Sequence, residues 1–384
     1  MNSLEEFLSG RDDWLFGHLG YDLKNEIENL TSGHPDRIKF PPAGFFIPVY
    51  IFIIRNNRLE AGWHPDYTGE EKVRKLIAEI ESSPVHLNGV NRIGKIEEVI
   101  SRSAYLETVE QIKVHIQRGD IYEVNFCQEF FSEKARIDPL STWLKLIEES
   151  PTPFSCFYRQ NEKYLLCSSP ERFLKKTGNR IISQPIKGTA GRGKTPEEDK
   201  KLLEILNNDP KERAENIMIT DLVRNDLSRI AARASVNVEE LCGIYPYPRV
   251  HQMQSTISAT LNHDTSFTDI IKASFPMGSM TGAPKIRAME IIEQYEKSKR
   301  GLYSGAVGYI TPEMDFDFNV VIRSIQYDRT ASSLSFMTGS AITGPSIPEN
   351  EYRECLLKAG AIKKVLSTLT PHSQSAPLSW KVHQ

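Results

Sequence analysis

The spacing of apolar positions along the chain predicts a series of helices. Apolar residues recur at helical spacing over 103–118, where Ser103 is expected to cap the start and Gly119 to end the helix. Thr195-Pro196 and Asp209-Pro210 are further start signals, each a cap residue followed by proline. The other expected helices are 70–81, 139–149, one opening at 195, 211–229, 269–275, one following the loop 278–284 and running through 295, and 348–369.

Strand patterns are interspersed with these helices without regular alternation. The expected strands are 45–55, 121–131, most of 236–257, 306–310, 316–325 and 334–337. Mixed groups of this kind favour an α+β architecture with antiparallel sheets over a doubly wound fold. Residues from Pro371 onward are polar and are expected to form a poorly ordered tail.

The stretch 168–192 contains two residues with chemical potential. Glu171 follows the apolar run 164–167, and Lys187 follows a second run. The turn residues 177–180 between them predict a hairpin, which would place a carboxyl group and an amine within cross-strand distance. A lysine shielded from water loses proton affinity and becomes a nucleophile. Taken singly, each residue also fits a structural role, as an edge-strand lysine and a salt-bridged glutamate.

Acidic residues on two of the expected helices form a candidate metal site. Glu215 lies on the apolar stripe of its helix, and a buried carboxylate needs a partner. Glu351 and Glu354 are three positions apart and share one helix face. Converging carboxylates suit Mg²⁺. The alternative for the second pair is a surface helix with Lys358 as the partner of Glu354. A structural polar network is expected for Asp221, Arg224, Asn225 and Asp226.

Several small-residue segments offer binding groups for an anion. The loop 278–284 lacks a P-loop or dinucleotide fingerprint, so no nucleotide is implied, yet a Gly- and Thr-rich loop at a helix N-terminus can bind a carboxylate. Lys285 adds charge, and Arg323 can hold a carboxylate through two hydrogen bonds. The expected turn 339–343 and Tyr303 fit the same site, although each is also consistent with an ordinary turn. Together they indicate a ligand with more than one carboxylate, a divalent cation, a lysine and a glutamate.

Composition argues against several other classes of function. The 384 residues are 39% apolar, the formal net charge is −3 and no basic run occurs, which argues against nucleic acid as a partner. The longest apolar run, 45–54, contains Pro48 and is too short for a bilayer, and no signal peptide is expected. Five scattered cysteines without Cys-x-x-Cys spacing argue against zinc and disulfides and favour the cytoplasm.

Five motifs in order carry a specific resemblance. They are Ser-Pro-Glu-Arg-Phe at 169–173, Pro-Ile-Lys-Gly-Thr at 185–189, Asp-Leu-Val-Arg-Asn-Asp-Leu at 221–227, Gly-Ser-Met-Thr-Gly-Ala-Pro-Lys at 278–285 and Glu-Tyr-Arg-Glu at 351–354. The chain resembles the chorismate-utilising enzymes over about 103–366, and weakly near Gly20. The resemblance implies antiparallel sheets packed as a sandwich with helices outside. It divides the chain into a shortened β-rich region (1–95), a chorismate-binding catalytic domain (96–370) and a tail (371–384).

The resemblance also implies an activity. Pro-Ile-Lys-Gly-Thr is the form found in aminodeoxychorismate synthases, whereas anthranilate synthases usually read Pro-Ile-Ala-Gly-Thr. It implies amination of chorismate at C4 on the route to p-aminobenzoate and folate, with Lys187 attacking C2 and Glu171 protonating the leaving hydroxyl. Mg²⁺ is expected at Glu215 and Glu354, supported by Glu351. The implied substrate contacts are Arg323, Thr281, Gly282, Tyr303, Gly339, Ser340, Ala341 and Lys358.

Some positions depart from the family pattern. Water-using members have lysine at the position of Glu123, and ammonia-using members commonly have Gln, so Glu123 argues against isochorismate synthesis while its own role stays open. Gln252 replaces a common histidine, with His251 one position earlier, and neither is given a catalytic role. No Gly-x-Cys-x-Gly context surrounds any cysteine, so ammonia is expected from solution or from a separate glutamine amidotransferase. The alternatives are anthranilate synthase component I and a non-catalytic chorismate-binding subunit.

Overall fold

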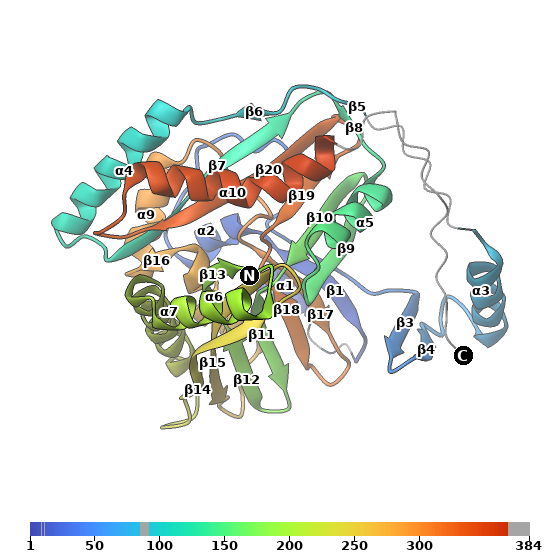
Figure 1. Cartoon of the computed structure of the whole chain (residues 1–384). Coiled ribbons are helices and arrows are strands. Elements are labelled where there is room, and N and C mark those ends of the chain that lie inside the picture. Colours follow the sequence, from blue (N-terminus) through green and yellow to red (C-terminus); the bar gives the residue numbers. More distant parts are fainter. Residues whose placement is uncertain (9, 11, 85–91, 368–384) are drawn as a thin grey trace.

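Two large antiparallel sheets organise the computed structural model, which describes residues 1–384 except 9, 11, 85–91 and 368–384 (Figure 1). One sheet has nine strands in the order β13-β15-β12-β11-β18-β17-β1-β2, with β14 paired to β15, and the other has seven in the order β16-β7-β20-β19-β10-β9, with β6 paired to β7. The strands of the first sheet are β1 Leu15–Leu19, β2 Ala43–Phe46, β11 Arg172–Thr177, β12 Arg180–Gln184, β13 Ile186–Gly191, β14 Asn237–Pro246, β15 Val250–Thr260, β17 Ala306–Ile310 and β18 Phe316–Asn319. The strands of the second are β6 Glu97–Glu98, β7 Glu123–Ser132, β9 Phe154–Gln160, β10 Lys163–Ser169, β16 Gly282–Ala283, β19 Ser324–Asp328 and β20 Ser333–Ile342.

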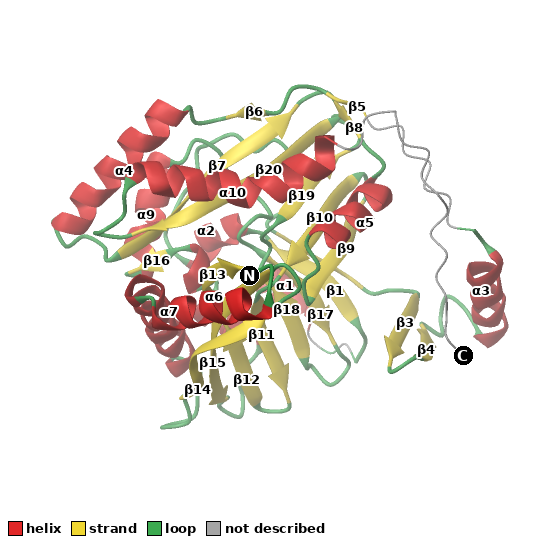
Figure 2. Ribbon diagram, viewed as in Figure 1, coloured by secondary structure: helices red, strands yellow, loops and turns green. Residues whose placement is uncertain are grey.

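The helices are distributed around the sheets, most of the longer ones on the outer sides, while α3 stands apart (Figure 2). They are α1 Asn2–Leu8, α2 Lys24–Ile27, α3 Glu70–Ser82, α4 Arg102–Gln117, α5 Pro139–Glu149, α6 Pro196–Asn208, α7 Pro210–Ser228, α8 Phe267–Ser274, α9 Lys285–Tyr295 and α10 Pro348–Ser367, with short 3-10 helices at Tyr21–Leu23 and Gly278–Met280. The predicted α+β sandwich is confirmed. Thr195 and Asp209 cap α6 and α7 as expected, but the cap of α4 is Ser101 and not Ser103.

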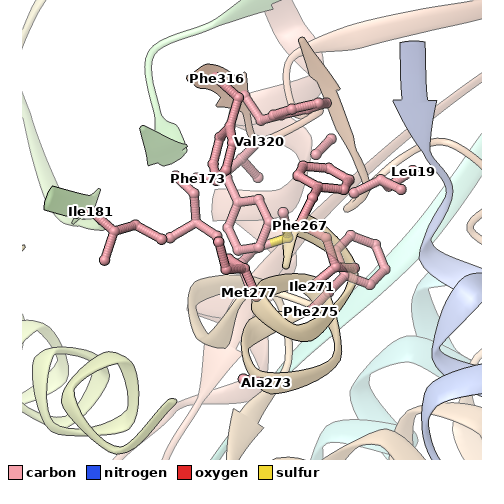
Figure 3. Close-up of a cluster of buried hydrophobic side chains, with 14 of the residues drawn as sticks. Leu19, Phe173, Ile181, Phe267, Ile271, Ala273, Phe275, Met277, Phe316 and Val320 are labelled. Carbon is pink, nitrogen blue, oxygen red and sulfur yellow. The ribbon is translucent and has the colours of Figure 1, made fainter. Parts of the chain in front are cut away.

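Apolar side chains fill three layers. Between the two sheets, Leu165 of the seven-stranded sheet and Val307 of the nine-stranded sheet belong to one buried cluster. A second cluster joins the nine-stranded sheet to α7 and α8 (Figure 3), in which the ring centroids of Phe267 of α8 and Phe316 of β18 lie 5.3 Å apart. A third joins the seven-stranded sheet to α4, α9 and α10. Burial of these faces from water supplies the main drive for folding.

Three expected elements are arranged differently. The strand predicted over 45–55 is divided, with Pro48 in the break, between β2 of the nine-stranded sheet and β3 Tyr50–Arg55, a partly exposed strand of a separate hairpin. The strand predicted over 316–325 is split into β18 and β19, which belong to different sheets, because the chain crosses between the sheets at residues 320–323. The turn predicted at 339–343 lies almost wholly in β20, which pairs with β7 from Leu334 to Ile342. Small residues are needed there for another reason: a Cβ at position 339 would lie 2.3 Å from the Phe126 carbonyl oxygen.

The N-terminal segment contributes to the large sheet. Strands β1 and β2 extend the nine-stranded sheet beyond β17. The hairpin of β3 Tyr50–Arg55 and β4 Arg58–Trp63 stands with α3 to one side of the sheets (Figure 1). A fourth, two-stranded sheet joins β5 Arg92–Ile93 to β8 Ala135–Arg136. The domain boundary at 95 stays a prediction, and the expected tail lies outside the described residues. Within the described residues, no helix is long and apolar enough to cross a membrane.

We expect Asp209→Ala to destabilise the protein through the start of α7. The Asp209 carboxylate accepts hydrogen bonds from the backbone N–H groups of Lys211 and Glu212, at 2.9 and 3.0 Å. Loss of such a cap costs about 1 kcal/mol, measurable by urea unfolding. Asp264→Ala removes a fully exposed aspartate that caps no helix and should change the free energy of unfolding by less than about 0.5 kcal/mol. Equal effects of the two substitutions would contradict the capping role.

Candidate active site

A cavity of about 570 Å³ lies at the ends of both sheets and against α7 and α10. Nine of the thirteen residues proposed for the site line it: Glu171, Lys187, Glu215, Tyr303, Arg323, Gly339, Ala341, Glu354 and Lys358. The other four, Thr281, Gly282, Ser340 and Glu351, are not part of its lining. The structure therefore brings together most residues that were chosen from separate motifs.

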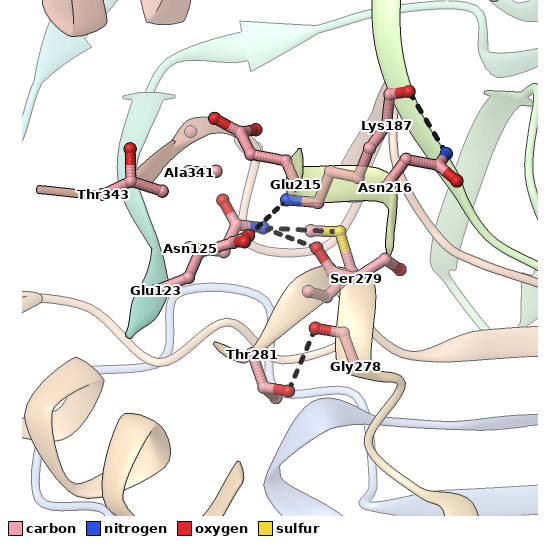
Figure 4. A network of polar contacts seen from close by, with 12 residues as sticks. Glu123, Asn125, Lys187, Glu215, Asn216, Gly278, Ser279, Thr281, Ala341 and Thr343 are labelled. Carbon is pink, nitrogen blue, oxygen red and sulfur yellow. Dashed lines mark hydrogen bonds and ion pairs between the residues drawn. The ribbon is translucent and has the colours of Figure 1, made fainter. Parts of the chain in front are cut away.

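Lys187 lies on β13, at the end of the nine-stranded sheet, with its side chain 12% exposed. Its Nζ donates a hydrogen bond to Glu123 Oε1 at 2.8 Å (Figure 4), and the side chain of Asn216 on α7 donates to its backbone carbonyl at 3.4 Å. Burial alone would lower the pKa of Lys187, but the carboxylates of Glu123, Glu215 and Glu171 outweigh it and hold the pKa above its ordinary value. The expected loss of proton affinity is therefore wrong for the free protein.

Glu171 precedes β11 and is fully enclosed. Burial raises its pKa to about 7, opposed by a hydrogen bond that Ser279 Oγ donates to Oε1 at 2.6 Å, by Lys187 and by the backbone of Ile186. The hairpin of β11 and β12 is present, with Thr177 opposite Arg180. Glu171 and Lys187 are not cross-strand neighbours, however, because Pro185 ends β12 and β13 pairs with β15 instead.

Three glutamates surround Lys211 at one side of the cavity. Lys211 Nζ lies 3.8 Å from Glu215 Oε1 and 3.4 Å from Glu351 Oε1. Burial raises the pKa of Glu215 to about 7. Burial alone would also raise the pKa of Glu354, but the Lys358 ammonium group, 2.7 Å away, outweighs it and the pKa is lowered. The Glu354–Lys358 pair that was considered as an alternative is therefore present.

The buried carboxylates retain free binding capacity. Glu215 Oε1 and Glu351 Oε2 are buried and accept no hydrogen bond from the described residues. Unsatisfied carboxylate oxygens of this kind fit a hard cation. Among the described residues, no three His, Cys, Asp or Glu side chains converge closely enough to enclose a metal by themselves. A cation here would therefore need further oxygens from substrate or water.

Arg323 is the cation best placed for an anionic ligand. It lies between β18 and β19 with φ of 50°, which turns its side chain toward the cavity that it lines. Burial lowers its pKa, and within the described residues no hydrogen bond or ion pair engages the guanidinium. A guanidinium shielded in this way gains most from a carboxylate partner.

The predicted residues outside the lining have other contacts. Thr281 Oγ1 donates to the Met277 and Gly278 carbonyls, and Gly282 pairs with Val124. Ser340 faces away from the cavity, toward Tyr105 at 3.4 Å, because residues alternate along β20. Lys285, which was expected to add charge near the loop, is paired with Asp226 at 2.5 Å and is not part of the cavity lining. The roles of Thr281, Gly282 and Ser340 in binding stay predictions.

Sequence reasoning missed several residues of the lining. The lining also includes Asn125, Lys211, Glu212, Ser279 and Thr338. Asn125 could have been predicted from the sequence, since it lies two positions after Glu123 and therefore on the same face of the expected strand. Lys211 lies one turn before Glu215, a spacing that placed it on the same helix face.

Gln252 and His251, neither of which was given a catalytic role, lie in different surroundings. Gln252 lines the cavity, and its Oε1 accepts no hydrogen bond from the described residues. His251 is buried outside the lining and its Nε2 lies 2.9 Å from Asp199 Oδ1. Alternation along β15 explains the difference.

Comparisons with known proteins place the chain in a family. The family model described as chorismate binding enzyme matches residues 2–364. The chain is 33% identical to aminodeoxychorismate synthase component 1 of Bacillus subtilis, over 91% of this chain and 76% of that protein. It is 35% identical to a probable chloroplastic aminodeoxychorismate synthase of Oryza sativa, over 91% of this chain but only 43% of that longer protein.

A solved structure agrees in fold. Anthranilate synthase component I from Streptococcus pneumoniae superposes with a TM-score of 0.81 and 26% identity, covering 91% of this chain and 80% of that one. The family match spans nearly the whole chain and includes all five motifs. The chain belongs to the chorismate binding enzyme family.

Proposed function

We propose that this protein aminates chorismate at C4 to give 4-amino-4-deoxychorismate, which leads to p-aminobenzoate and folate. The observation that carries the proposal is that the amine of Lys187 and the carboxyl group of Glu171 line one cavity with Arg323, whose guanidinium forms no hydrogen bond or ion pair with the residues that the structure describes. The names of relatives that share the fold and most of the length of the chain support the choice of reaction.

Lys187 and Glu171 divide the reaction into two displacements. The neutral amine of Lys187 attacks C2, the two ring double bonds shift, and the C4–O bond breaks. Glu171, whose pKa is raised by burial to about 7, retains a proton near neutral pH and gives it to the departing hydroxyl, which leaves as water. Ammonia then adds at C4, the double bonds shift back and the C2–N bond breaks.

Arg323 and the small residues of β20 define where the substrate lies. The guanidinium pairs with one carboxylate of chorismate, and Gly339 and Ala341 leave the adjoining wall open for the ring. Tyr303 and Lys358 complete this wall. The enclosed position excludes bulk water, which would otherwise compete with ammonia.

Glu215 and Glu354 would hold Mg²⁺, with Glu351 behind them. The charge of the bound Mg²⁺ would neutralise a carboxylate of the substrate. The unsatisfied Glu215 Oε1 and Glu351 Oε2 support this assignment. Lys211, now between Glu215 and Glu351, would have to swing toward solvent, which its half-exposed side chain permits.

We expect removal of divalent metal to abolish turnover. Treatment with EDTA followed by dialysis should lower product formation to background, and added Mg²⁺ should restore it. Glu215→Gln should raise the Mg²⁺ concentration needed for half-maximal rate at least tenfold, because it removes one ligand charge. Glu290→Gln, an exposed substitution on α9, serves as control. Full activity after chelation would contradict the assignment.

Ammonia comes, in this proposal, from a separate glutamine amidotransferase or from ammonium salts. A second candidate is anthranilate synthesis, favoured by the structural similarity to the Streptococcus pneumoniae enzyme. The two are separated by incubating the protein with chorismate, Mg²⁺ and ammonium chloride and identifying products by mass spectrometry. The proposal expects an aminated product that retains the enolpyruvyl group, whereas fluorescent anthranilate without added lyase would reject it. No conversion at all would favour a non-catalytic subunit.

A further inference from the structure

Glu123 is a buried carboxylate that the proposed reaction has not yet used. It begins β7, next to β16, and its side chain is 1% exposed. Its Oε1 accepts the hydrogen bond from Lys187 Nζ at 2.8 Å. Figure 4 shows the Lys187 side chain reaching from β13 to Glu123 across the interior of the site, with Glu215 close by.

The second oxygen of Glu123 has no assigned partner. Oε2 is buried and accepts no hydrogen bond from the described residues. A buried carboxylate that served only to neutralise a lysine would be expected to satisfy both oxygens, since each unsatisfied polar atom costs free energy. Because Oε2 is not engaged by another described residue, the Glu123 carboxylate can accept a proton from the neighbouring ammonium group of Lys187.

The charges around Nζ show why a base is needed. Besides Glu123, the carboxylates of Glu171, Glu215, Glu212 and Glu354 act on the ammonium group, from the β11 end, α7 and α10. They favour the charged form, and an ammonium group has no lone pair with which to attack carbon. The proton must therefore go to an acceptor when substrate closes the site.

We propose that Glu123 is the catalytic base that takes this proton from Lys187, an assignment that rests on the proposed function. One proton moves along the hydrogen bond, leaving a neutral amine and a carboxylic acid. The lone pair of the amine forms the N–C2 bond while Glu171 supplies the proton that makes the C4 hydroxyl leave as water. When ammonia adds at C4, the C2–N pair returns to Lys187 as a neutral amine, which recovers its proton from Glu123. The new ammonium group at C4 gives one proton back to Glu171, so both carboxyl groups end in the state in which they began.

Other carboxylates are less suited to this step. Within the described residues, Glu123 is the acceptor that hydrogen-bonds Nζ. Glu171 accepts a hydrogen bond from Ser279 and is already committed as the acid. Burial of both side chains also favours the transfer, because the transfer neutralises two opposite charges that little water reaches.

Glu123→Gln provides the test, because the amide keeps the size of the side chain and cannot act as a base. We expect kcat for aminodeoxychorismate formation to fall by about 10²-fold or more, in the range of general base catalysis, and KM for chorismate to change less than threefold. The ratio of the variant's kcat to the wild-type kcat should rise with pH, because water and hydroxide must then remove the proton from Lys187, whereas the decline caused by ionisation of Glu171 is common to both proteins. Glu123→Asp should recover part of kcat and the wild-type pH profile.

Glu129→Gln is the matched control, since Glu129 is buried on the same strand but hydrogen-bonds Ser335 and Ser298 away from the cavity. It should keep kcat within threefold. Unchanged kcat in Glu123→Gln, or an equal loss in Glu123→Asp with the wild-type pH profile in both, would overturn the inference. The assay also identifies the wild-type product, so failure of the proposed function (no aminated product from the wild type) is distinguished from failure of this inference alone.

Discussion

Replacing Lys187 by arginine should abolish amination even though it preserves the charge. Lysine at this position pairs with Glu123 at 2.8 Å, and arginine can reproduce that ion pair without supplying a nucleophile, since its guanidinium stays protonated. We expect kcat to fall by about 10³-fold or more in both Lys187→Arg and Lys187→Ala, the scale seen when an enzyme loses its nucleophile. Product formation from chorismate and ammonium chloride measures it.

The comparison of the two variants separates covalent from electrostatic catalysis. If Lys187 acts only by its charge, Lys187→Arg should stay within tenfold of the wild type while Lys187→Ala loses activity. Lys176→Ala is a suitable control. This lysine is also largely buried in the nine-stranded sheet, but it pairs with Asp315 and does not line the cavity. It should leave kcat within threefold.

Glu171→Gln should have the second largest effect on turnover and should change its pH dependence. The carboxyl group must be protonated to assist the leaving hydroxyl, and burial raises its pKa to about 7. The acid form is therefore depleted as pH rises through 7, and the wild-type rate should decline above that pH. Loss of this general acid should lower kcat by about 10²- to 10⁴-fold, measured from pH 5.5 to 9.

Glu171→Gln should also lack the decline of rate above pH 7, because the amide does not titrate. Ser279→Ala removes the donor at 2.6 Å that favours the ionised form of Glu171. The pKa of the acid should then rise, and the declining limb of the wild-type profile should move to higher pH. A declining limb that persists unchanged in Glu171→Gln would assign it to another group.

Local signals in the sequence defined many of the elements because they depend on short-range chemistry. The caps at Thr195 and Asp209 and the end of α4 at Gly119 are each decided within one helical turn. The break between β18 and β19 was not predictable in this way. Residues 316–325 contain no glycine or proline that would signal a break, and the strand is interrupted only because the chain crosses there between two sheets.

In the site, too, some features could be predicted from local sequence and others depend on tertiary contacts. Sequence patterns identified Lys187, Glu171, Glu215 and Arg323, which the structure gathers around one cavity from three separate segments. The protonation of Lys187 could not be predicted, since it depends on Glu123, which lies 64 positions away in sequence. The orientation of Ser340 was not predicted for a related reason. A turn was expected at this position, whereas pairing with β7 makes it part of a strand, in which successive side chains point to opposite faces.

The covalent role of Lys187 can be tested most directly by mass spectrometry of the protein itself. Wild-type enzyme is mixed with chorismate and Mg²⁺ in ammonia-free buffer, quenched, digested and mapped, and a second sample receives ammonium chloride before quenching. The account predicts that the peptide containing Lys187 gains the mass of chorismate less one water in the first sample and loses it in the second. An unmodified Lys187 peptide in a preparation that aminates chorismate once ammonium is added would contradict it.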